Sequence, residues 1–389
     1  MIKKVFASLF AVVILLCAVG CGTYSEVGKK ADSSTSMISD DSGSQPSDDG
    51  TDQTDTTESG DESGDGSGDG SDTSEQGDGS DDSGSEDGDK IERPDTSNMK
   101  KILFLGNSHA KDTYMALPEI FRAEGYTDYT FGLAYYGQQD IADHASYIGN
   151  DSAVYTYFLS KPDVQNGKIR TPNGKTDGNY NLVTFESILT DQEWDIVFIQ
   201  VCMRDVVLSD DVYASSRQTV VNFIRSKAPD AKIGTSCSWL APYSDDPNAS
   251  PGKWANIAVA YNNYGTTPAD HCNRHCKVMK DNIVKDATYC LNIDVCTPVF
   301  YANQVLEISS DVLYRDVAHM SQFGRGLVSY SFFAQYTGAE IEEIKLDSLS
   351  GYVAPSGTNA LTLTVEQKNI IKASANYAFN SPWTVPSAE

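Results

Sequence analysis

Two segments far apart in the sequence carry side chains with the chemistry of acyl transfer. Ser108 follows a short apolar run, and Asp316 lies three residues before His319 near the end of the chain. A serine hydroxyl is a weak nucleophile unless a base within hydrogen-bond reach takes its proton. An aspartate one turn before a histidine can sit beside the imidazole and fix its tautomer. The three residues are therefore candidates for a nucleophile, its base and the carboxylate that orients the base.

Each of these candidates also has a plainer structural explanation. Serine at a strand-to-helix turn commonly caps the helix through its side-chain oxygen. The Asp-x-x-His spacing also arises in surface turns, and four other histidines are present as bases. We expect His109 to line the rim of the pocket, because its side chain diverges from that of Ser108. We expect His144 to be a structural or rim residue.

The elements that must position these side chains alternate between strands and helices. Apolar runs predict five strands, near residues 100–106, 129–136, 194–201, 232–239 and 293–299. Three- and four-residue apolar spacing predicts a helix after the first strand and others near residues 215–228, 268–287, 326–336 and 365–377. The polar stretch 160–180 is expected to be an insertion or a long hairpin. This order predicts a three-layer α/β/α sandwich around a parallel sheet, with its site beyond the carboxyl ends of the strands.

With Ser108 at the end of the first strand, the sequence resembles the SGNH (GDSL-like) hydrolases, in particular the branch catalogued as DUF4886. The likeness covers most of the chain from Met99 and is carried by three segments, residues 102–112, 194–200 and 316–338. It implies the flavodoxin-like fold of that superfamily and a serine esterase without a cofactor. By this resemblance Ser108 attacks an ester carbonyl, His319 takes its proton, and Asp316 stabilises the charged imidazole.

The same resemblance indicates where the oxyanion of the reaction intermediate binds. The backbone N–H groups of Ser108 and of Gly137, after the second strand, are the expected donors. Gln200 ends the third predicted strand, where this branch places a glutamine, and its amide is a further expected donor; a hydrogen-bonding role at the rim is the alternative. Asn107 replaces the aspartate that commonly precedes the nucleophile, and we expect it to contribute to substrate binding.

A second group of reactive side chains lies in the segment His271-Cys272-x-x-His275-Cys276. Its i, i+4 spacing on a predicted helix is compatible with zinc. Exposed helical residues, or cysteines that pair elsewhere, explain it better, and we expect no metal site. An even number of cysteines after the signal segment permits disulfides in an oxidising compartment without fixing their pairing. These cysteines are Cys202, Cys237, Cys272, Cys276, Cys290 and Cys296.

The N-terminus predicts export to a membrane surface. Two lysines precede an apolar run from Val5 to Val19, and small residues follow, which is the order of a secretory signal. The sequence Ala-Val-Gly-Cys21 resembles a bacterial lipobox, in which the cysteine is diacylated and becomes the mature N-terminus. An ordinary signal with an incidental cysteine is the alternative. Residues 1–21 are thus expected to be a lipoprotein signal peptide, and the acyl chains to hold the protein at the outer face of the cell membrane.

Residues 22–98 are expected to form a disordered acidic linker. From residue 31 to residue 98 there are 22 acidic and two basic side chains, so this stretch carries −20 of the net charge of −26. Segments with so few apolar residues cannot repay the entropy of ordering. Residues 99–389 remain as one hydrolase-like domain, whose small acidic excess argues against nucleic-acid binding.

These features predict a surface-anchored serine esterase that removes ester-linked acyl groups, above all acetyl groups, from carbohydrates. An acyltransferase on the same fold is one alternative, and a glycan-binding lipoprotein without turnover is another. A pure binder has no need of all three triad residues. Several aromatic residues follow strand ends and are expected either to stack on sugar rings or to pack at the mouth of the site: Tyr135, Tyr136, Trp239 and Tyr243.

Overall fold

The computed structural model describes residues 93–162, 175–176, 179–180, 182–203, 210–240, 267–316, 318–347 and 361–386. The predicted signal peptide, Cys21 and the predicted linker up to residue 92 lie outside the described residues. The last part of that linker packs on the domain, since Thr96 is buried and donates a hydrogen bond to the carbonyl of Tyr336. In the described part of the chain, no helix is long and apolar enough to cross a membrane.

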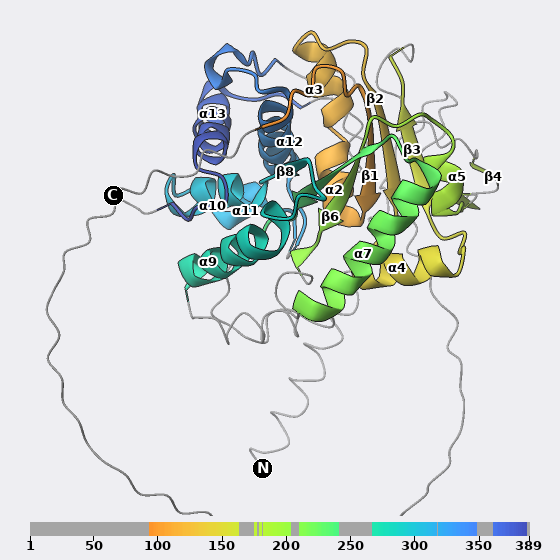
Figure 1. Ribbon diagram of the computed structural model, residues 1–389. Coiled ribbons are helices and arrows are strands. Elements are labelled where there is room, and N and C mark those ends of the chain that lie inside the picture. Colours follow the sequence, from red (N-terminus) through yellow and green to blue (C-terminus); the bar gives the residue numbers. More distant parts are fainter. Residues whose placement is uncertain are drawn as a thin grey trace, which may run out of the picture. The chain divides into compact units, whose positions relative to one another are not determined.

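A six-stranded sheet in the order β3-β2-β1-β6-β7-β8 forms the middle layer (Figure 1). Its strands are β1 (Lys101–Gly106), β2 (Thr130–Tyr135), β3 (Thr156–Ser160), β6 (Ile196–Val201), β7 (Lys232–Cys237) and β8 (Leu291–Ile293). All neighbouring strands are parallel except β2 and β3. Gly106 pairs with Tyr135, and Leu105 pairs with Ile199. The carboxyl ends of the three central strands β2, β1 and β6 therefore meet at one edge of the sheet.

On one face of the sheet, the long helix α12 (Gln322–Thr337) is the centre of the helical layer. It packs against α2 (Ser108–Tyr114), α3 (Leu117–Ala123) and α13 (Val365–Asn380). Almost all of α12 is buried, because this helix lies between the sheet and its neighbours. This arrangement brings the first helix after β1 against a helix from near the end of the chain.

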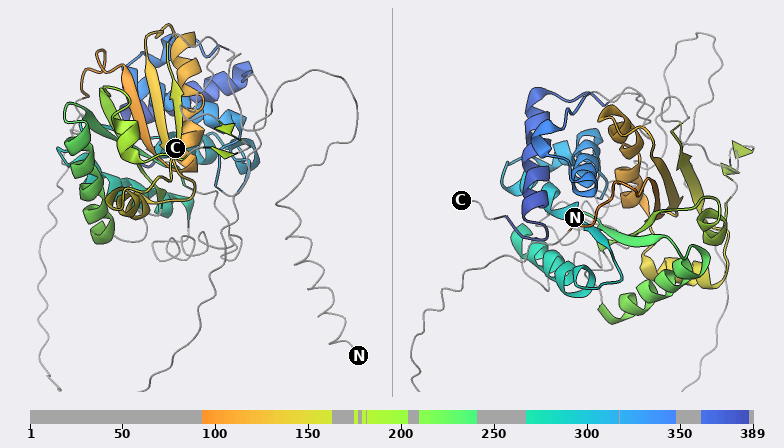
Figure 2. Two further views of the ribbon diagram at one scale, coloured as in Figure 1. Left: turned by 90° about the vertical axis from the view of Figure 1, so that its right-hand side faces the viewer. Right: turned by 45° about the horizontal axis from the view of Figure 1, so that its top comes forward.

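The opposite face of the sheet is covered by a second helical layer (Figure 2). Here α4 (Ile141–Gly149) packs against α7 (Asp210–Lys227), and α9 (Pro268–Met279) lies on the same face. With helices on both faces, every residue of β6 is buried, which explains its uninterrupted apolar sequence. The predicted α/β/α architecture is confirmed.

The sheet contains one strand more than the expected five. The additional strand, β3, pairs antiparallel with β2 at the edge of the sheet. Tyr157 and Leu159 are buried, whereas the intervening Phe158 is only partly buried. An edge strand lacks the continuous apolar run of a central one, and the sequence analysis recognised only such runs.

The predicted strand over residues 293–299 is wrong beyond its first residue. β8 ends at Ile293, and the helix α10 (Cys296–Gln304) begins three residues later. The Asp294 carboxylate accepts hydrogen bonds from the N–H groups of Cys296 and Thr297 at 3.0 and 2.9 Å, which satisfies donors of the first helical turn. Pro298 also fits a first turn. The apolar run is thus a buried helix, a case that hydrophobic pattern alone does not separate from a short strand.

Other predicted elements are present with different bounds. The helix expected after β1 is split into α2 and α3, with Pro118 near the start of the second. The long helix expected over residues 268–287 is α9 followed by a π-helical turn. The remaining elements are β4 (Lys175–Thr176), β5 (Asn179–Tyr180), α5 (Phe185–Leu189), the π turn (Lys280–Val284), α11 (Ser310–Leu313) and the 3-10 turn (Ile341–Glu343).

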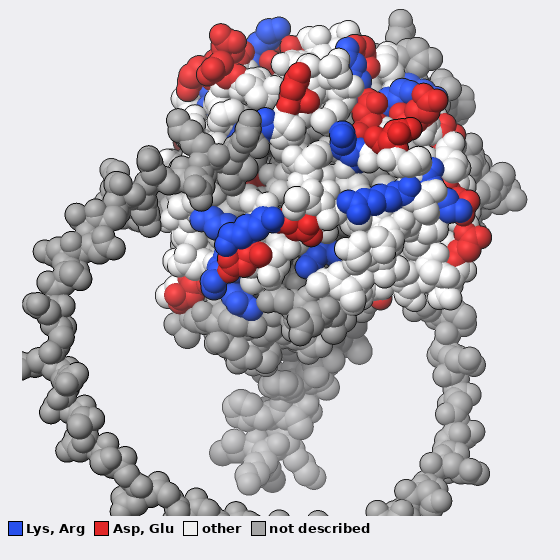
Figure 3. Space-filling model, viewed as in Figure 1, with Lys and Arg blue, Asp and Glu red and all other residues white. Residues whose placement is uncertain are grey.

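The surface of the described residues carries both signs of charge. On the face shown in Figure 3, Lys and Arg side chains form small groups beside groups of Asp and Glu. Ion pairs of adjacent side chains, such as Lys277 with Asp281 on the α9 side, account for part of this pattern. The strongly one-signed composition of residues 31–98 is therefore not continued on this face.

Candidate active site

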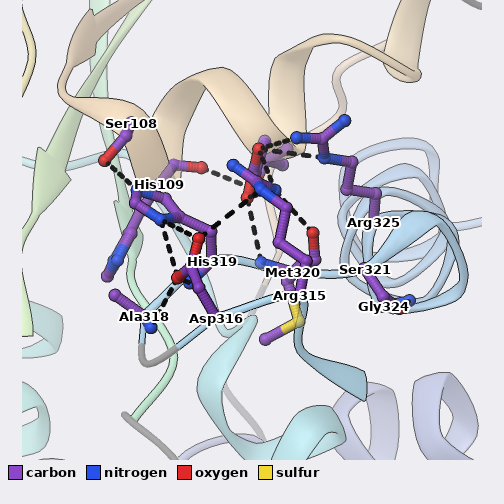
Figure 4. Close-up of polar contacts among 12 residues, drawn as sticks. Ser108, His109, Arg315, Asp316, Ala318, His319, Met320, Ser321, Gly324 and Arg325 are labelled. Atoms are coloured by element: carbon purple, nitrogen blue, oxygen red, sulfur yellow. Dashed lines mark hydrogen bonds and ion pairs between the residues drawn. The ribbon is translucent and has the colours of Figure 1, made fainter. Parts of the chain in front are cut away.

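The structure brings Ser108, His319 and Asp316 together in one hydrogen-bonded chain (Figure 4). The Ser108 hydroxyl oxygen lies 2.8 Å from Nε2 of His319. The other ring nitrogen, Nδ1, lies 2.9 Å from both carboxylate oxygens of Asp316. These are the distances that proton transfer from a serine to a base requires. The arrangement can therefore raise the nucleophilicity of Ser108 and stabilise a protonated His319.

Asn107, and not Ser108, caps the helix that begins at the nucleophile. Its side-chain oxygen accepts a hydrogen bond from the His109 N–H at 3.0 Å, while its backbone is extended. Ser108 is the first helical residue, so its hydroxyl is not used by the cap and points to the base. The helix cap, which was the alternative role for Ser108, is therefore supplied by Asn107. Asn107 is buried, and its amide nitrogen donates to the carbonyl of Gln139, so both ends of its side chain have structural partners.

The base and its carboxylate lie on the loop between α11 and α12, residues 314–321, called the base loop below. The N–H of Arg315 donates to the carbonyl of His319 at 2.9 Å, which closes the loop on itself. Asp316 accepts hydrogen bonds from the N–H groups of Ala318 and His319 at 2.9 and 2.8 Å. The carboxylate is therefore held in place by the backbone that carries the imidazole.

These contacts also fix the charge of Asp316. Burial raises the pKa of the Asp316 carboxyl, but the hydrogen bonds from the His319 ring and from the N–H groups of Ala318 and His319 outweigh burial. Together they hold this pKa well below its usual value. The carboxylate is thus ionised at any pH at which an esterase works, as an orienting group must be.

His109 is a buried residue beneath the base and not the expected rim residue. Its ring stacks on Trp239 at 4.6 Å between centroids and meets the His319 ring edge-on at 5.8 Å. Burial, assisted by the nearby His319, lowers the pKa of His109 to about 3, so the ring is neutral at neutral pH. The side chain does turn away from Ser108 as expected, but it turns into the core, where only 2% of the residue is exposed.

Trp239 supports the base loop from below. It is fully buried, and its indole N–H donates to the carbonyl of Ala318 at 2.8 Å. Of the two roles expected for this residue, packing is therefore the one that the structure shows. Tyr136 and Tyr135 remain partly exposed beside β2, while Tyr243 lies outside the described residues.

The end of β6, the strand next to β1 in the sheet, supplies the Gln200 side chain. Its Oε1 atom accepts a hydrogen bond from the Asn107 N–H at 2.8 Å. Its Nε2 atom is buried and has no hydrogen-bond partner among the residues that the structure describes. A Cβ atom at Gly106 would lie 2.4 Å from Oε1, so only glycine allows this close approach. Gln200 thus holds the turn before Ser108 and keeps an unused donor next to it.

Gly137 lies in the turn that follows β2, beside the turn that carries Ser108. The two turns are joined by hydrogen bonds from the Tyr136 N–H to the Gly106 carbonyl, at 3.2 Å, and from the Asn107 side chain to the Gln139 carbonyl, at 2.8 Å. The oxyanion roles of Gly137 and Gln200, and the substrate-binding role of Asn107, remain predictions. Asn107 lies in the turn that carries the nucleophile, Gln200 accepts a hydrogen bond from it, and Gly137 lies in the neighbouring turn.

Sequence reasoning missed a buried charged group that joins α2 to the base loop. Asp112, Arg315 and Arg325 form ion pairs, with nitrogen–oxygen distances of 2.9 Å for Arg315 and 2.7 Å for Arg325. Asp112 and Arg325 lie within the segments that carried the family resemblance, and Arg315 directly precedes Asp316. The sequence signal was Arg325, the single charged residue of α12, whereas Asp112 lies in a polar helix and Arg315 in a loop.

The two cysteines of α9 and His275 form a separate buried group, whereas His271 is only partly buried. Cys272, His275 and Cys276 face the core, and the sulfur atoms of Cys272 and Cys276 lie 3.9 Å apart. A hydrogen bond from Cys272, together with the nearby His275, lowers the pKa of Cys296 to about 6. Cys237, Cys272, Cys276, Cys290 and Cys296 are free thiols in the described structure. Within the described ranges, no three or more metal-ligating side chains are placed to hold an ion.

Comparisons with known proteins identify solved structures with a similar fold. No protein-family model and no curated protein matches the sequence. The crystal structure of a DUF4886 family protein from Bacteroides uniformis is similar, with a TM-score of 0.56 and 20% identity over 74% of this chain and 96% of that one. A proposed SGNH hydrolase from Slackia heliotrinireducens shares 17% identity over 61% of this chain and 99% of its own, with a TM-score of 0.36. TesA shares 13% identity over 61% and 98%, with a TM-score of 0.33.

At this level of identity, the likeness to the DUF4886 protein shows a shared fold. The expected fold, including its resemblance to the DUF4886 branch, is confirmed by this comparison. The roles of individual residues rest on the geometry described above.

Proposed function

We propose that this protein is a serine ester hydrolase of the SGNH superfamily, with Ser108 as its nucleophile. The observation that carries the proposal is the unbroken hydrogen-bonded chain from Ser108 through His319 to Asp316. The three residues come from two segments more than 200 positions apart, with 211 positions between the serine and the histidine. A structural capping serine has no need of an oriented imidazole, and here another residue supplies the cap.

The reaction proceeds in two acyl-transfer steps. As the Ser108 oxygen bonds to the ester carbonyl carbon, its proton passes to Nε2 of His319, and the carbonyl electron pair moves onto oxygen. The tetrahedral intermediate collapses, the bond to the leaving alkoxide breaks, and His319 returns the proton to that alkoxide. Water then attacks the carbonyl carbon of the acyl-serine and gives a proton to His319. The bond from that carbon to the Ser108 oxygen breaks, the carboxylic acid leaves, and His319 returns the proton to the Ser108 oxygen.

Asp316 and the oxyanion donors have distinct tasks in this cycle. Asp316 accepts a hydrogen bond from the Nδ1–H group, keeps Nε2 directed at Ser108, and stabilises the imidazolium by its fixed negative charge. The oxyanion is bound by the Ser108 N–H, with the Gln200 amide and the Gly137 N–H as further donors. The buried Nε2 atom of Gln200 supports this role, since a buried donor without a protein partner is costly unless a ligand uses it.

For the substrate, we propose ester-linked acetyl groups on carbohydrates at the outer surface of a bacterial cell. The support is indirect: a signal-like N-terminus, a lipobox-like sequence ending in Cys21 and an acidic spacer of nearly 80 residues all fit a tethered surface enzyme. The partly exposed Tyr135 and Tyr136 lie next to the turn that carries Ser108 and offer faces for sugar rings.

The decisive experiment compares the purified protein with its Ser108→Ala variant in the hydrolysis of an aryl acetate. We expect kcat/KM to fall by about 10⁴-fold or more, because the acyl-enzyme cannot form. Ser152→Ala, an equal change away from the described site, should leave the rate unaltered. Equal rates for Ser108→Ala and the native protein would refute the proposed function. Acetate release from a panel of acetylated polysaccharides then identifies the carbohydrate.

A further inference from the structure

Asp112 lies one helical turn after Ser108 on α2, and its side chain is almost completely buried. Only 3% of the side chain is exposed. An ionised carboxylate in such a position is stable only when charged or hydrogen-bonding partners surround it. The partners of Asp112 come from the base loop and from the start of α12.

Both oxygen atoms of Asp112 bind groups that lie next to the proposed base. Oδ2 accepts a hydrogen bond from the Met320 N–H at 3.0 Å, one residue after His319. Nη1 of Arg315 lies 2.9 Å from Oδ2 and also donates to the Met320 carbonyl at 2.6 Å. Oδ1 accepts from Nε of Arg325 at 2.9 Å, at the start of α12. The carboxylate therefore joins the helix of the nucleophile to the backbone of the base loop.

Arg315 extends this network to the triad itself. Its Nε atom lies 3.7 Å from the Asp316 carboxylate, and its N–H donates to the carbonyl of His319. A continuous line of charged contacts thus runs from Arg325 through Asp112 and Arg315 to Asp316. In Figure 4, Arg315 and Arg325 lie to the right of Ser108 and His319.

Stability alone does not account for such a network. Apolar side chains of similar volume commonly stabilise a core as well as a buried ion pair does, because the charges must first be desolvated. What a carboxylate adds is direction, since each oxygen fixes its donor at a defined distance and angle. Here the donors are the loop that carries the base and the helix that follows it.

We propose that Asp112, acting through Arg315 and the Met320 N–H, is a positioning residue that sets the separation between Ser108 and His319. The inference rests on the proposed function, because it assigns these residues to the same reaction. The carboxylate touches neither substrate nor the reacting atoms. It holds the base loop at the distance where the imidazole meets the Ser108 hydroxyl.

The test uses Arg315→Gln first. The Arg315 side chain is 39% exposed, so this change disturbs folding less than a change at the buried Asp112. A displacement of the base by about 1 Å costs on the order of 100-fold in rate. We therefore expect kcat for aryl acetate hydrolysis to fall by about 100-fold while KM changes little. Arg315→Lys, which keeps the charge near Asp112, should recover part of the loss. Asp112→Asn should reproduce the Arg315→Gln result.

A matched control is Arg122→Gln on α3. Arg122 is also an ion-paired, partly buried arginine, but its partner is Glu119 and not the base loop. This variant should keep the native kcat. A native kcat in Arg315→Gln, in a protein whose circular dichroism and melting show that it is folded, would overturn the inference.

A second readout does not depend on turnover. The proton between His319 Nδ1 and Asp316 gives a downfield imidazole resonance, which His319→Ala should abolish and Ser108→Ala should keep. We expect Arg315→Gln and Asp112→Asn to shift or broaden it, and Arg122→Gln to leave it unchanged. An unchanged resonance in folded Arg315→Gln would contradict a positioning role even if Ser108→Ala had already confirmed the nucleophile. Full activity in Ser108→Ala would refute the proposed function while this resonance still reports on the network.

Discussion

Two groups of residues hold the turn that carries Ser108, and they differ in how completely their polar atoms are paired. We call the group around His319 the base side and the group around Gln200 the amide side. On the base side, His319, Asp316 and the charged residues behind them form a closed set of hydrogen bonds and ion pairs. On the amide side, Gln200 holds the Asn107 N–H with its oxygen, but its amide nitrogen has no partner within the described residues. The contacts named here hold the base side together, whereas the Gln200 amide nitrogen has no hydrogen-bond partner among the described residues.

This difference matches the two tasks of acyl transfer. A proton moves to or from the imidazole in every step, so the base side has to be fixed before the substrate arrives. The oxyanion exists only during the reaction, so its donors gain their partner only then. We therefore expect loss of the base itself to remove nearly all turnover and changes on the amide side to slow it.

The largest effect should follow from His319→Ala. Without the imidazole, the Ser108 proton has no acceptor, and we expect kcat/KM for an aryl acetate to fall by about 10⁴-fold. His271→Ala is the matched control, because it makes the same chemical change on α9, away from the base loop. A loss of activity in both variants, or in neither, would remove the distinction between this histidine and the others.

A smaller effect is expected on the amide side from Gln200→Glu. Glutamate keeps an oxygen for the Asn107 N–H and replaces only the unused donor, so the turn before Ser108 should stay intact. Removal of one oxyanion donor typically lowers kcat by about 100-fold or more. Steady-state kinetics should show this loss in kcat with little change in KM. A native kcat would return Gln200 to a purely structural role.

The smallest expected effect is on stability and concerns His144, a buried residue of α4, the helix that follows the turn with Gly137. Burial lowers the pKa of His144 to about 4, whereas the unfolded chain binds this proton near pH 6.5. Between these values the unfolded state holds more protons, so the free energy of unfolding decreases as the pH falls. From pH 7 to pH 5 the loss is about 2 kcal/mol for one such group.

Urea unfolding at pH 7 and pH 5 measures this loss. His144→Gln should reduce the difference between the two conditions, because it removes the group that titrates only in the unfolded state. If the free energy of unfolding of the variant falls as much from pH 7 to pH 5 as that of the native protein, His144 contributes nothing to the pH dependence.

The parts of the site that sequence analysis anticipated are those with a local signature. The apolar run that ends at Gly106 identifies the central strand, and the three-residue spacing of Asp316 and His319 lets the loop backbone hold the carboxylate beside the ring. The end of a parallel strand and a late loop then meet because the sheet places them at one edge. The apolar run and the Asp-x-x-His spacing can each be read from a few consecutive residues.

The parts that it did not anticipate depend on contacts between distant segments. Asp112 binds residues more than 200 positions away, and nothing near it in the sequence distinguishes it from an exposed helical aspartate. The burial of His109 depends on Trp239, which belongs to another strand end. The mistaken strand at 293–299 has a different cause, since Asp294 redirects an apolar run into a helix through two hydrogen bonds.

The most direct test of the account is covalent labelling by a fluorophosphonate, which phosphonylates an activated serine and releases fluoride. Intact-mass and peptide-mass analysis should show one adduct, on Ser108, formed at a rate that drops sharply in His319→Ala. Labelling of a different residue, or equal labelling of Ser108→Ala and the native protein, would contradict the assignment of the nucleophile.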